Sequence, residues 1–487
     1  MRAARLLPRF PAKVARAGSG GGKIETGLDR RELVRRGLWE APLAILALLL
    51  LGTGAGIMPP DALIGAGVVQ LNLERLLVLA AFGALLAVEL GRRRRYAALE
   101  GGSTPPRRAW RRLTPTGLEL PLALLLLAAL VATIEWGTEA RFRFLAEGVA
   151  VFYLAFAVVR TRPEARGTLA VVALVAVSLA ALTGIAQVSQ EDATGFYRVD
   201  CVPVTRPAAP PPADSITRAT GTFSNPNVLA GFLLLLAPMA ALAAGPLRDA
   251  ARGRLAVGLL VALAYLALAL TYSRAAVLFA LAALGAGALA SSLRHRAYVA
   301  AAGVAIAVGA SLLFAGCGSD ATAGYGRAEE WRETIEVARD HPVRGVGLGR
   351  LGDILRERTG IGTVRHAHNL LLTWWAEAGT GALIAWLALL VVLLRRSFRA
   401  ARAGDAAARA AFVALAGFTG FSMLDHPANV DRVALAFWIV AGIAAACGPA
   451  AARGGGSGSP PDEPDPAAVP RPPAPAAAPD ALGHGGR

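Results

Sequence analysis

The chain has little charge for its length. Asp, Glu, Lys and Arg make up only 17% of its 487 residues, whereas hydrophobic residues make up 55%. The mean hydropathy of +0.49 agrees with this imbalance. Such a composition argues against a soluble protein and predicts a chain whose apolar segments lie in a lipid bilayer.

A cleavable signal peptide is also missing. Residues 1–40 are basic and contain no apolar core, and the first apolar run lacks a convincing small-residue cleavage site. We therefore expect that run to remain as an uncleaved membrane anchor.

Cysteine is scarce, with three in the whole chain. Cys201 and Cys317 fall in predicted outer loops, and Cys447 falls near the inner end of the last apolar run. An oxidising exterior allows a Cys201–Cys317 disulfide. Two unpaired thiols fit the sequence equally well, because spacing alone gives no distance between them.

Long apolar runs are what the sequence has in abundance. A helix needs roughly 20 residues to cross a bilayer, so the runs predict an all-α, polytopic membrane bundle of about twelve transmembrane helices. The eleventh is the shortest. The predicted spans are Ala41–Met58, Leu76–Leu90, Leu118–Trp136, Phe144–Val159, Leu169–Val188, Val228–Ala244, Leu255–Leu270, Ala275–Ala290, Tyr298–Ala315, Leu370–Leu394, Ala411–Met423 and Val433–Cys447.

Basic residues predict the orientation of these spans. They crowd residues 1–36 and 92–112, alternate connections continue the pattern, and the opposite connections hold few of them. Cytoplasmic loops retain positive charge, so both termini are predicted to be cytoplasmic. The net charge of +16 comes mostly from these connections. Topology and attraction to anionic membrane lipids explain it, and we expect no nucleic-acid partner.

Three regions follow from this pattern. Residues 1–39 form a basic cytoplasmic segment, residues 40–447 form the membrane domain, and residues 448–487 form a tail rich in Pro and Gly. The tail has few large apolar residues, so we expect it to be disordered.

A polar, Arg-rich insert at residues 316–368 separates the ninth and tenth predicted spans and falls on the outer side. A loop this long is a candidate for function. Trp331, Ile335 and Ala338 predict a helix with one apolar face, and a second short helix is expected near Leu351. The insert ends in His366-Ala367-His368-Asn369, and an imidazole there can accept a proton from a hydroxyl. An ordinary hydrogen-bonded histidine is the alternative.

Two other polar segments face the same side. Thr220 to Gly231 leads into the sixth span, and after its Asn-Pro turn Asn227 is expected to cap the helix. Arg274 lies between two apolar spans, where a guanidinium either snorkels or binds an anion such as phosphate. Arg327, near the start of the first insert helix, adds positive charge to a helix end that already favours anions.

The order of four segments resembles the O-antigen ligase and polymerase superfamily. These segments are GTFSNPNVLAGF, TYSRAAV, GRAEEWRETIEVARDHPVRGVGLG and HAHNLLLTWWAEAGTGAL, which together cover roughly residues 220–394. The resemblance implies a glycosyltransferase that moves a glycan from undecaprenyl diphosphate to the hydroxyl of an acceptor, either lipid A–core or another glycan. It implies a bacterial inner-membrane protein whose active site faces the periplasm and needs neither metal nor other cofactor.

The resemblance also assigns residues. The family's outer-loop histidine looks like His368, although His366 is an alternative base, and its arginines look like Arg274 and Arg327. Such a site must hold the diphosphate, stabilise its growing charge and deprotonate the acceptor. Further candidates for contact with the diphosphate or sugar, or for orienting His368, are Arg141, Arg143, Asn225, Asn227, Arg344 and Asn369.

Several activities remain open. The shared motifs do not separate a polymerase from a ligase or from a protein O-oligosaccharyltransferase. A transporter or flippase for polysaccharide intermediates is the alternative from another class. Such transporters usually contain internal repeats, and the two halves of this sequence show no evident duplication.

Overall fold

The structure is a computed structural model of the whole chain. It describes residues 30–55, 64–66, 69–71, 77–84, 86–87, 117–192, 194–199, 202–205, 214–247, 250–290, 322–360 and 366–447. The predicted ninth span, the proposed Cys201–Cys317 disulfide, the C-terminal tail and most of the N-terminal segment lie outside the described residues. The predicted second span is described only in part.

The described chain is mostly helical. Its helices are α1 (Arg30–Ala55), α4 (Glu119–Trp136), α5 (Glu139–Thr161), α6 (Ala165–Ser189), α7 (Pro226–Ala240), η1 (Ala241–Leu247), α8 (Ala251–Leu270), α9 (Arg274–Leu289), α11 (Thr322–Asp340), α12 (Leu351–Thr359), α13 (Leu370–Arg402), α14 (Ala406–Phe421), η2 (Pro427–Asn429) and α15 (Asp431–Ala446). Seven candidate spans among the described residues are long and apolar enough to cross a membrane. This confirms a helical membrane protein.

The predicted spans agree with the described helices. Apart from Leu76–Leu90 and Tyr298–Ala315, each one coincides with a helix. Three of these helices, α9, α14 and α15, are only 16 residues long. At 1.5 Å per residue they are shorter than the roughly 30 Å of hydrocarbon in a typical bilayer. The total of twelve spans stays a prediction.

Short strands occur beside the helices, and sequence reasoning did not anticipate them. Strands β1 (Ile64–Ala66) and β2 (Val69–Leu71) pair antiparallel. The connection between α6 and α7 holds β3 (Phe196–Val199), β4 (Val202–Thr205) and β5 (Ile216–Thr217), with β3 in the middle. These strands are too short to reveal an alternating pattern against long apolar runs.

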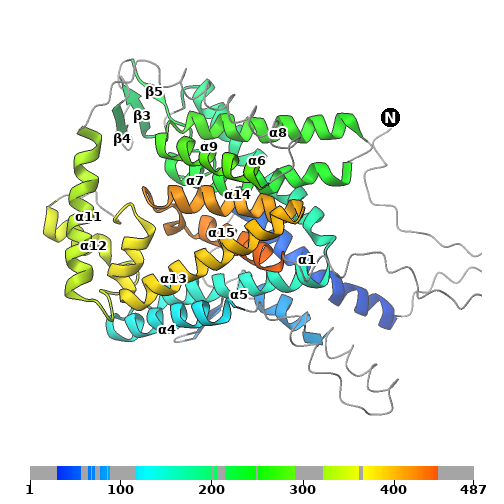
Figure 1. The fold of residues 1–487 in the computed structure, drawn as a ribbon, viewed down its shortest axis with the longest axis horizontal. Coiled ribbons are helices and arrows are strands. Elements are labelled where there is room, and N and C mark those ends of the chain that lie inside the picture. Colours follow the sequence, from blue (N-terminus) through cyan, green and yellow to red (C-terminus); the bar gives the residue numbers. More distant parts are fainter. Residues whose placement is uncertain are drawn as a thin grey trace, which may run out of the picture.

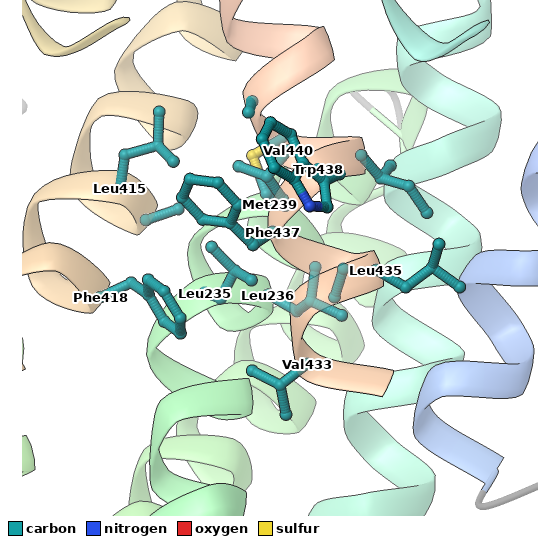
Figure 2. Packing of buried hydrophobic residues seen from close by; sticks show 14 of the residues in the cluster. Leu235, Leu236, Met239, Leu415, Phe418, Val433, Leu435, Phe437, Trp438 and Val440 are labelled. Carbon is teal, nitrogen blue, oxygen red and sulfur yellow. The ribbon is translucent and has the colours of Figure 1, made fainter. Parts of the chain in front are cut away.

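Helix α15 is the centre of the bundle. Every residue from Val433 to Ala446 is buried, as expected of a helix that is apolar all round. Figure 2 shows Phe437 and Trp438 of α15 among side chains of α7 and α14. Helix α5 can lie close to α15 because Gly148 has no side chain. A Cβ at this position would overlap the Trp438 indole. Small residues at such contacts let membrane helices approach one another closely.

The insert helices lie across one end of the bundle. Figure 1 shows α11 and α12 at that end, close to the three-stranded sheet of β3, β4 and β5. Both helices of the insert were predicted from the sequence, and both are confirmed. Helix α11 packs against α13, with Val337 and Ala338 buried. The Trp331 indole donates to the Ala367 carbonyl, which anchors the end of the insert.

The loop between α11 and α12 forms backbone hydrogen bonds at a kink in α13. Gly379 has φ 80° and ψ 178°, a conformation almost restricted to glycine, and it divides α13 into two parts. The loop pairs with this kink through Thr380 N–H to Pro342 O at 2.7 Å and Gly347 N–H to Glu377 O at 2.9 Å. The part of α13 after Gly379 runs to Arg402 and can cross about 30 Å of hydrocarbon by itself.

We predict that Gly379→Ala destabilises the fold by more than about 2 kcal/mol. The new Cβ requires an unfavourable φ and overlaps the Val343 carbonyl oxygen. Thermal unfolding of the detergent-solubilised chain measures the effect, which is a fall in Tm of at least about 2 °C for a chain of this length. Gly381→Ala is the matched control, because the nearest atom to its Cβ is 3.9 Å away. Equal Tm values for the two variants would contradict this account of the kink.

Candidate active site

Two polar segments from distant parts of the sequence meet at the start of α13. The first is His366 to Asn369, and the second is the turn between α14 and η2. Leu370 N–H donates to Ser422 O at 2.8 Å, and the Asn369 side chain donates to Met423 O at 2.9 Å. Both contacts fix the position of His368 relative to the turn.

The turn carries a buried carboxylate, Asp425, which lies against His368. Its Oδ1 is 3.4 Å from His368 Nδ1 and accepts from the His426 backbone N–H at 2.6 Å. Its Oδ2 accepts from Asn227 Nδ2 at 2.6 Å. Burial alone would raise the pKa of the Asp425 carboxyl, but the His368 hydrogen bond and nearby positive charge outweigh it and lower the pKa to about 2. Asp425 is therefore ionised at neutral pH.

The ionised carboxylate fixes the tautomer of His368. An ionised carboxylate only accepts hydrogen bonds, so the proton of a neutral His368 lies on Nδ1 and the lone pair lies on Nε2. His366 is held differently, because its Nδ1 accepts from the His368 backbone N–H at 3.1 Å. A neutral His366 then carries its proton on Nε2 and has no free lone pair. This geometry favours His368 over His366 as a base.

His368 has a strained backbone. Its φ is 48°, in the left-handed region that residues other than glycine rarely adopt. Strain of this kind persists where surrounding contacts over-determine the conformation, and it is common at functional sites. Here the His366 ring, Asn369 and the Asp425 carboxylate all hold the His368 residue in place.

The Asn-Pro-Asn turn before α7 also contacts the site. The roles of its two asparagines differ from those predicted. The prediction that Asn227 caps the helix was wrong. Asn225 is the N-cap of α7, and its side chain accepts from the Asn227 backbone N–H at 2.8 Å. The reason is that Pro226 already begins the helix at its first position. The Asn227 side chain is thus available to bind Asp425.

Side chains from other helices hold this turn. Gln187 Oε1 accepts from Gly221 N–H at 2.8 Å, and Gln187 Nε2 donates to Gly221 O at 3.0 Å. Arg432 donates to Thr222 O at 2.7 Å and lies over the Phe223 ring. These contacts tie the turn to α6 and α15, so Asn227 reaches Asp425 from a fixed position.

Two arginines, Arg218 and Arg327, contribute positive charge near Asp425. Arg218 is buried, and its Nε donates to Thr271 O at 2.9 Å. Burial lowers the pKa of Arg218 to about 10, with Asp425 opposing the shift and Arg327 adding to it. The charge of Arg327 is therefore close to that of Arg218. Arg274 is exposed at the first position of α9, three residues after Thr271.

Comparison with known proteins identifies a family domain within the chain. Residues 259–387 match the family model described as O-antigen ligase. The chain carries an O-antigen ligase domain. The match includes Arg274, Arg327 and His368, and it confirms the superfamily that the sequence resembles. No curated protein matches the chain.

The O-antigen ligase match stops before Asp425 and starts after Arg218 and the Asn225–Asn227 turn. Sequence reasoning missed Asp425 and Arg218, because an isolated acid or base in a connection does not reveal what it contacts. Asp425-His426-Pro427 was a detectable signal, since it places polar residues in a short connection between two apolar runs.

A second acidic group near His368 was also missed. Burial raises the pKa of Glu330 on α11, and the charges of His368 and Arg327 oppose the shift. Among the described residues its Oε2 is buried without a hydrogen-bond partner. Glu330 is therefore a partly buried carboxyl group close enough to His368 to interact with its charge.

The remaining candidates make ion pairs or caps, or are placed only by their position on a helix. Arg344 pairs with Glu135 at 2.8 Å, and both side chains are largely exposed. Arg141 pairs with Asp431 at 3.7 Å, and Arg143 lies half-buried two residues later on α5. The Asn369 side chain is the N-cap of α13, where it accepts from the N–H groups of residues 371 and 372.

The same groups have the geometry to hold a metal ion. Ligand atoms of His366, His368 and Asp425 lie within 4.8 Å of one another. Two imidazoles and a carboxylate are common ligands for Zn²⁺ and other transition metals. Metal binding is thus the chemical alternative to a free histidine base, and a chelator separates the two.

We predict that Asp425 makes the fold acid-sensitive. Its depressed pKa contributes stability that is fully present above the ordinary value of 3.8 and is lost as the pH falls through about 2. The contribution is on the order of 2 kcal/mol. Between about pH 5 and about pH 2, the Tm of the wild type should fall further than that of Asp425→Asn. Asp353→Asn, on an exposed side chain, should behave as the wild type does. Parallel Tm losses in the wild type and Asp425→Asn would contradict the assignment.

Proposed function

We propose that this chain moves a glycan from an undecaprenyl diphosphate carrier to an acceptor hydroxyl on the outer face of the bacterial inner membrane, as a polysaccharide or O-antigen polymerase or ligase. The observation that carries the proposal is the contact between His368 and ionised Asp425 in a chain with an O-antigen ligase domain. A histidine with a fixed tautomer and a free Nε2 is equipped to act as a general base.

The transfer step follows from this arrangement. The acceptor hydroxyl oxygen attacks C1 of the donor sugar, and its proton passes to His368 Nε2. The bond between C1 and the diphosphate oxygen breaks, and the carrier diphosphate leaves with the bonding electron pair. Asp425 stabilises the imidazolium that forms, because it already accepts from Nδ1. His368 thus needs no other partner during the proton transfer.

Arginines stabilise the departing diphosphate in this proposal. Arg327 is close enough to Arg218 to disfavour the charge of Arg218. Two cations held together in this way favour a multiply charged anion between or beside them. Arg274 at the start of α9 adds a guanidinium to a helix end that favours anions. Arg141, Arg143, Arg344, Asn225, Asn227 and Asn369 remain candidates for contact with the diphosphate or glycan or for support of His368.

The site also needs the correct side of the membrane. We infer from the distribution of basic residues that both termini are cytoplasmic and that the insert faces the periplasm. Carrier-linked donor and lipid A–core or glycan acceptor would meet there, beside the membrane surface. A protein acceptor, as used by protein O-oligosaccharyltransferases, is the alternative within the same superfamily.

We predict that His368→Asn lowers the rate of transfer by about 10²- to 10⁴-fold, the usual contribution of a general base. His366→Asn keeps an acceptor near the His368 N–H and should lose no more than about tenfold. The measurement is transfer of labelled glycan from carrier lipid by purified chain. A greater loss in His366→Asn than in His368→Asn would assign the base to His366.

Two further arms of the same assay test the rest of the site. Arg274→Ala should abolish transfer at unchanged protein level, whereas Arg332→Ala, on an exposed ion pair, should behave as the wild type does. A chelator should leave the rate unchanged. Loss of transfer in the chelator, restored by a divalent ion, would mean that His366, His368 and Asp425 bind metal.

Deletion of the gene that encodes this chain distinguishes a polymerase from a ligase. Gel analysis of surface glycan shows single repeats on core if the chain is a polymerase, and bare core with carrier-linked long chains if it is a ligase. Purified chain that moves carrier lipid across vesicles without changing any glycan linkage would instead be a transporter.

A further inference from the structure

A pocket lies directly beside the His368–Asp425 pair. It lies between α5, α13, α15 and the turn that follows Asp425, and its empty space of roughly 700 Å³ includes open solvent at its mouth. Leu370 and His426 line it, and these residues lie two positions after His368 and one after Asp425. A ligand in this pocket would therefore be next to the reacting groups.

Aromatic rings form the wall of the pocket. Trp374 and Trp386 of α13 stack with ring centroids 5.2 Å apart, and Trp386 stacks on Phe437 at 5.5 Å. Phe144 and Trp438 also line the space. Flat rings of this kind provide an apolar surface for a flat ligand, while an indole N–H provides a directed hydrogen bond.

Polar groups in the same wall are short of partners. Trp386 Nε1 and His426 Nδ1 are buried, and neither has a hydrogen-bond partner among the described residues. Glu377 lines the pocket as well, and its carboxylate accepts from the backbone N–H groups of Gly349 and Leu351, the latter at 3.4 Å. Each unsatisfied buried group costs about 1–3 kcal/mol.

We propose that this pocket binds one pyranose ring of a glycan substrate, which rests on the aromatic wall and hydrogen-bonds through its hydroxyls to Trp386, Glu377 and His426. The inference rests on the proposed glycan transfer and names a subsite for it. A sugar ring has apolar C–H faces and hydroxyls that both donate and accept. An isoprenoid tail would leave the indole N–H of Trp386 and the imidazole Nδ1 of His426 unsatisfied, so hydrocarbon fits this wall poorly.

Conservative variants test the subsite. Trp386→Phe removes the N–H and keeps an aromatic ring, and Glu377→Gln removes the charge and keeps the shape. Trp375→Phe is the matched control, because the Trp375 indole bonds to Thr380 and does not line the pocket. Binding is measured by saturation-transfer NMR of the detergent-solubilised chain with methyl pyranosides of glucose, galactose, mannose and N-acetylglucosamine.

We expect at least one pyranoside to show contact through its ring protons in the wild type and in Trp375→Phe, and to lose it in both pocket variants. In transfer assays, Trp386→Phe should raise the KM of one substrate by about tenfold with kcat little changed, as expected when one hydrogen bond is lost. A raised donor KM assigns the ring to the carrier-linked glycan, and a raised acceptor KM assigns it to the acceptor.

Two results would overturn the subsite. One is the absence of contact from every pyranoside. The other is binding of farnesol, but of no pyranoside, that is lost in Trp386→Phe, since this would mean a lipid tail fills the pocket. Failure of the proposed glycan transfer would give a different result from failure of the subsite. Pyranoside contact without any His368-dependent transfer would remove the transferase assignment and leave the pocket, whereas His368-dependent transfer without pyranoside contact would remove only the subsite.

Discussion

The buried carboxylate of Asp425 is the constraint on which the site depends. A charge removed from water is costly unless hydrogen bonds and opposite charge replace the lost hydration. Asn227 from the start of α7, the His368 ring before α13 and the backbone N–H of His426 provide that replacement. Three parts of the chain must therefore adopt one relative arrangement. The arrangement fixes the tautomer of His368 and brings the Asn-Pro-Asn turn to the same point.

The insert is held in place by a second feature, the kink of α13. Gly379 allows the loop after α11 to pair with the α13 backbone, and α11 then lies against α13 with Trp331 holding the Ala367 carbonyl. Arg327 and Glu330 on α11 thereby come close to Arg218, His368 and Asp425. The same kink separates residues 370–378 from the longer part of α13, and the aromatic pocket lies along both parts. His368, Arg327 and the pocket are thus all positioned by α13 and by the insert that packs against it.

Much of this architecture was readable from the sequence. Apolar length and the asymmetry of basic residues predict a helical membrane protein, and the order of four polar segments indicates the superfamily that the O-antigen ligase match confirms. The two insert helices were predicted from their apolar spacing. Local patterns such as these depend on neighbours within a few residues, which a sequence displays directly.

The parts that sequence reasoning missed depend on contacts between distant residues. Asp425 and His368 are 57 positions apart, and Asn227 and Asp425 are 198 positions apart. The Asn225 cap of α7 was different, because Pro226 at the first helical position is a local signal for it. No local pattern shows that Arg218 is buried beside Thr271. The central claim is that His368 and Asp425 act as one unit, and a double-mutant cycle on the rate of glycan transfer tests it most directly. The account predicts that adding Asp425→Asn to His368→Asn slows transfer no further than His368→Asn alone. Multiplication of the two single losses would show that the residues act independently, and would contradict the account.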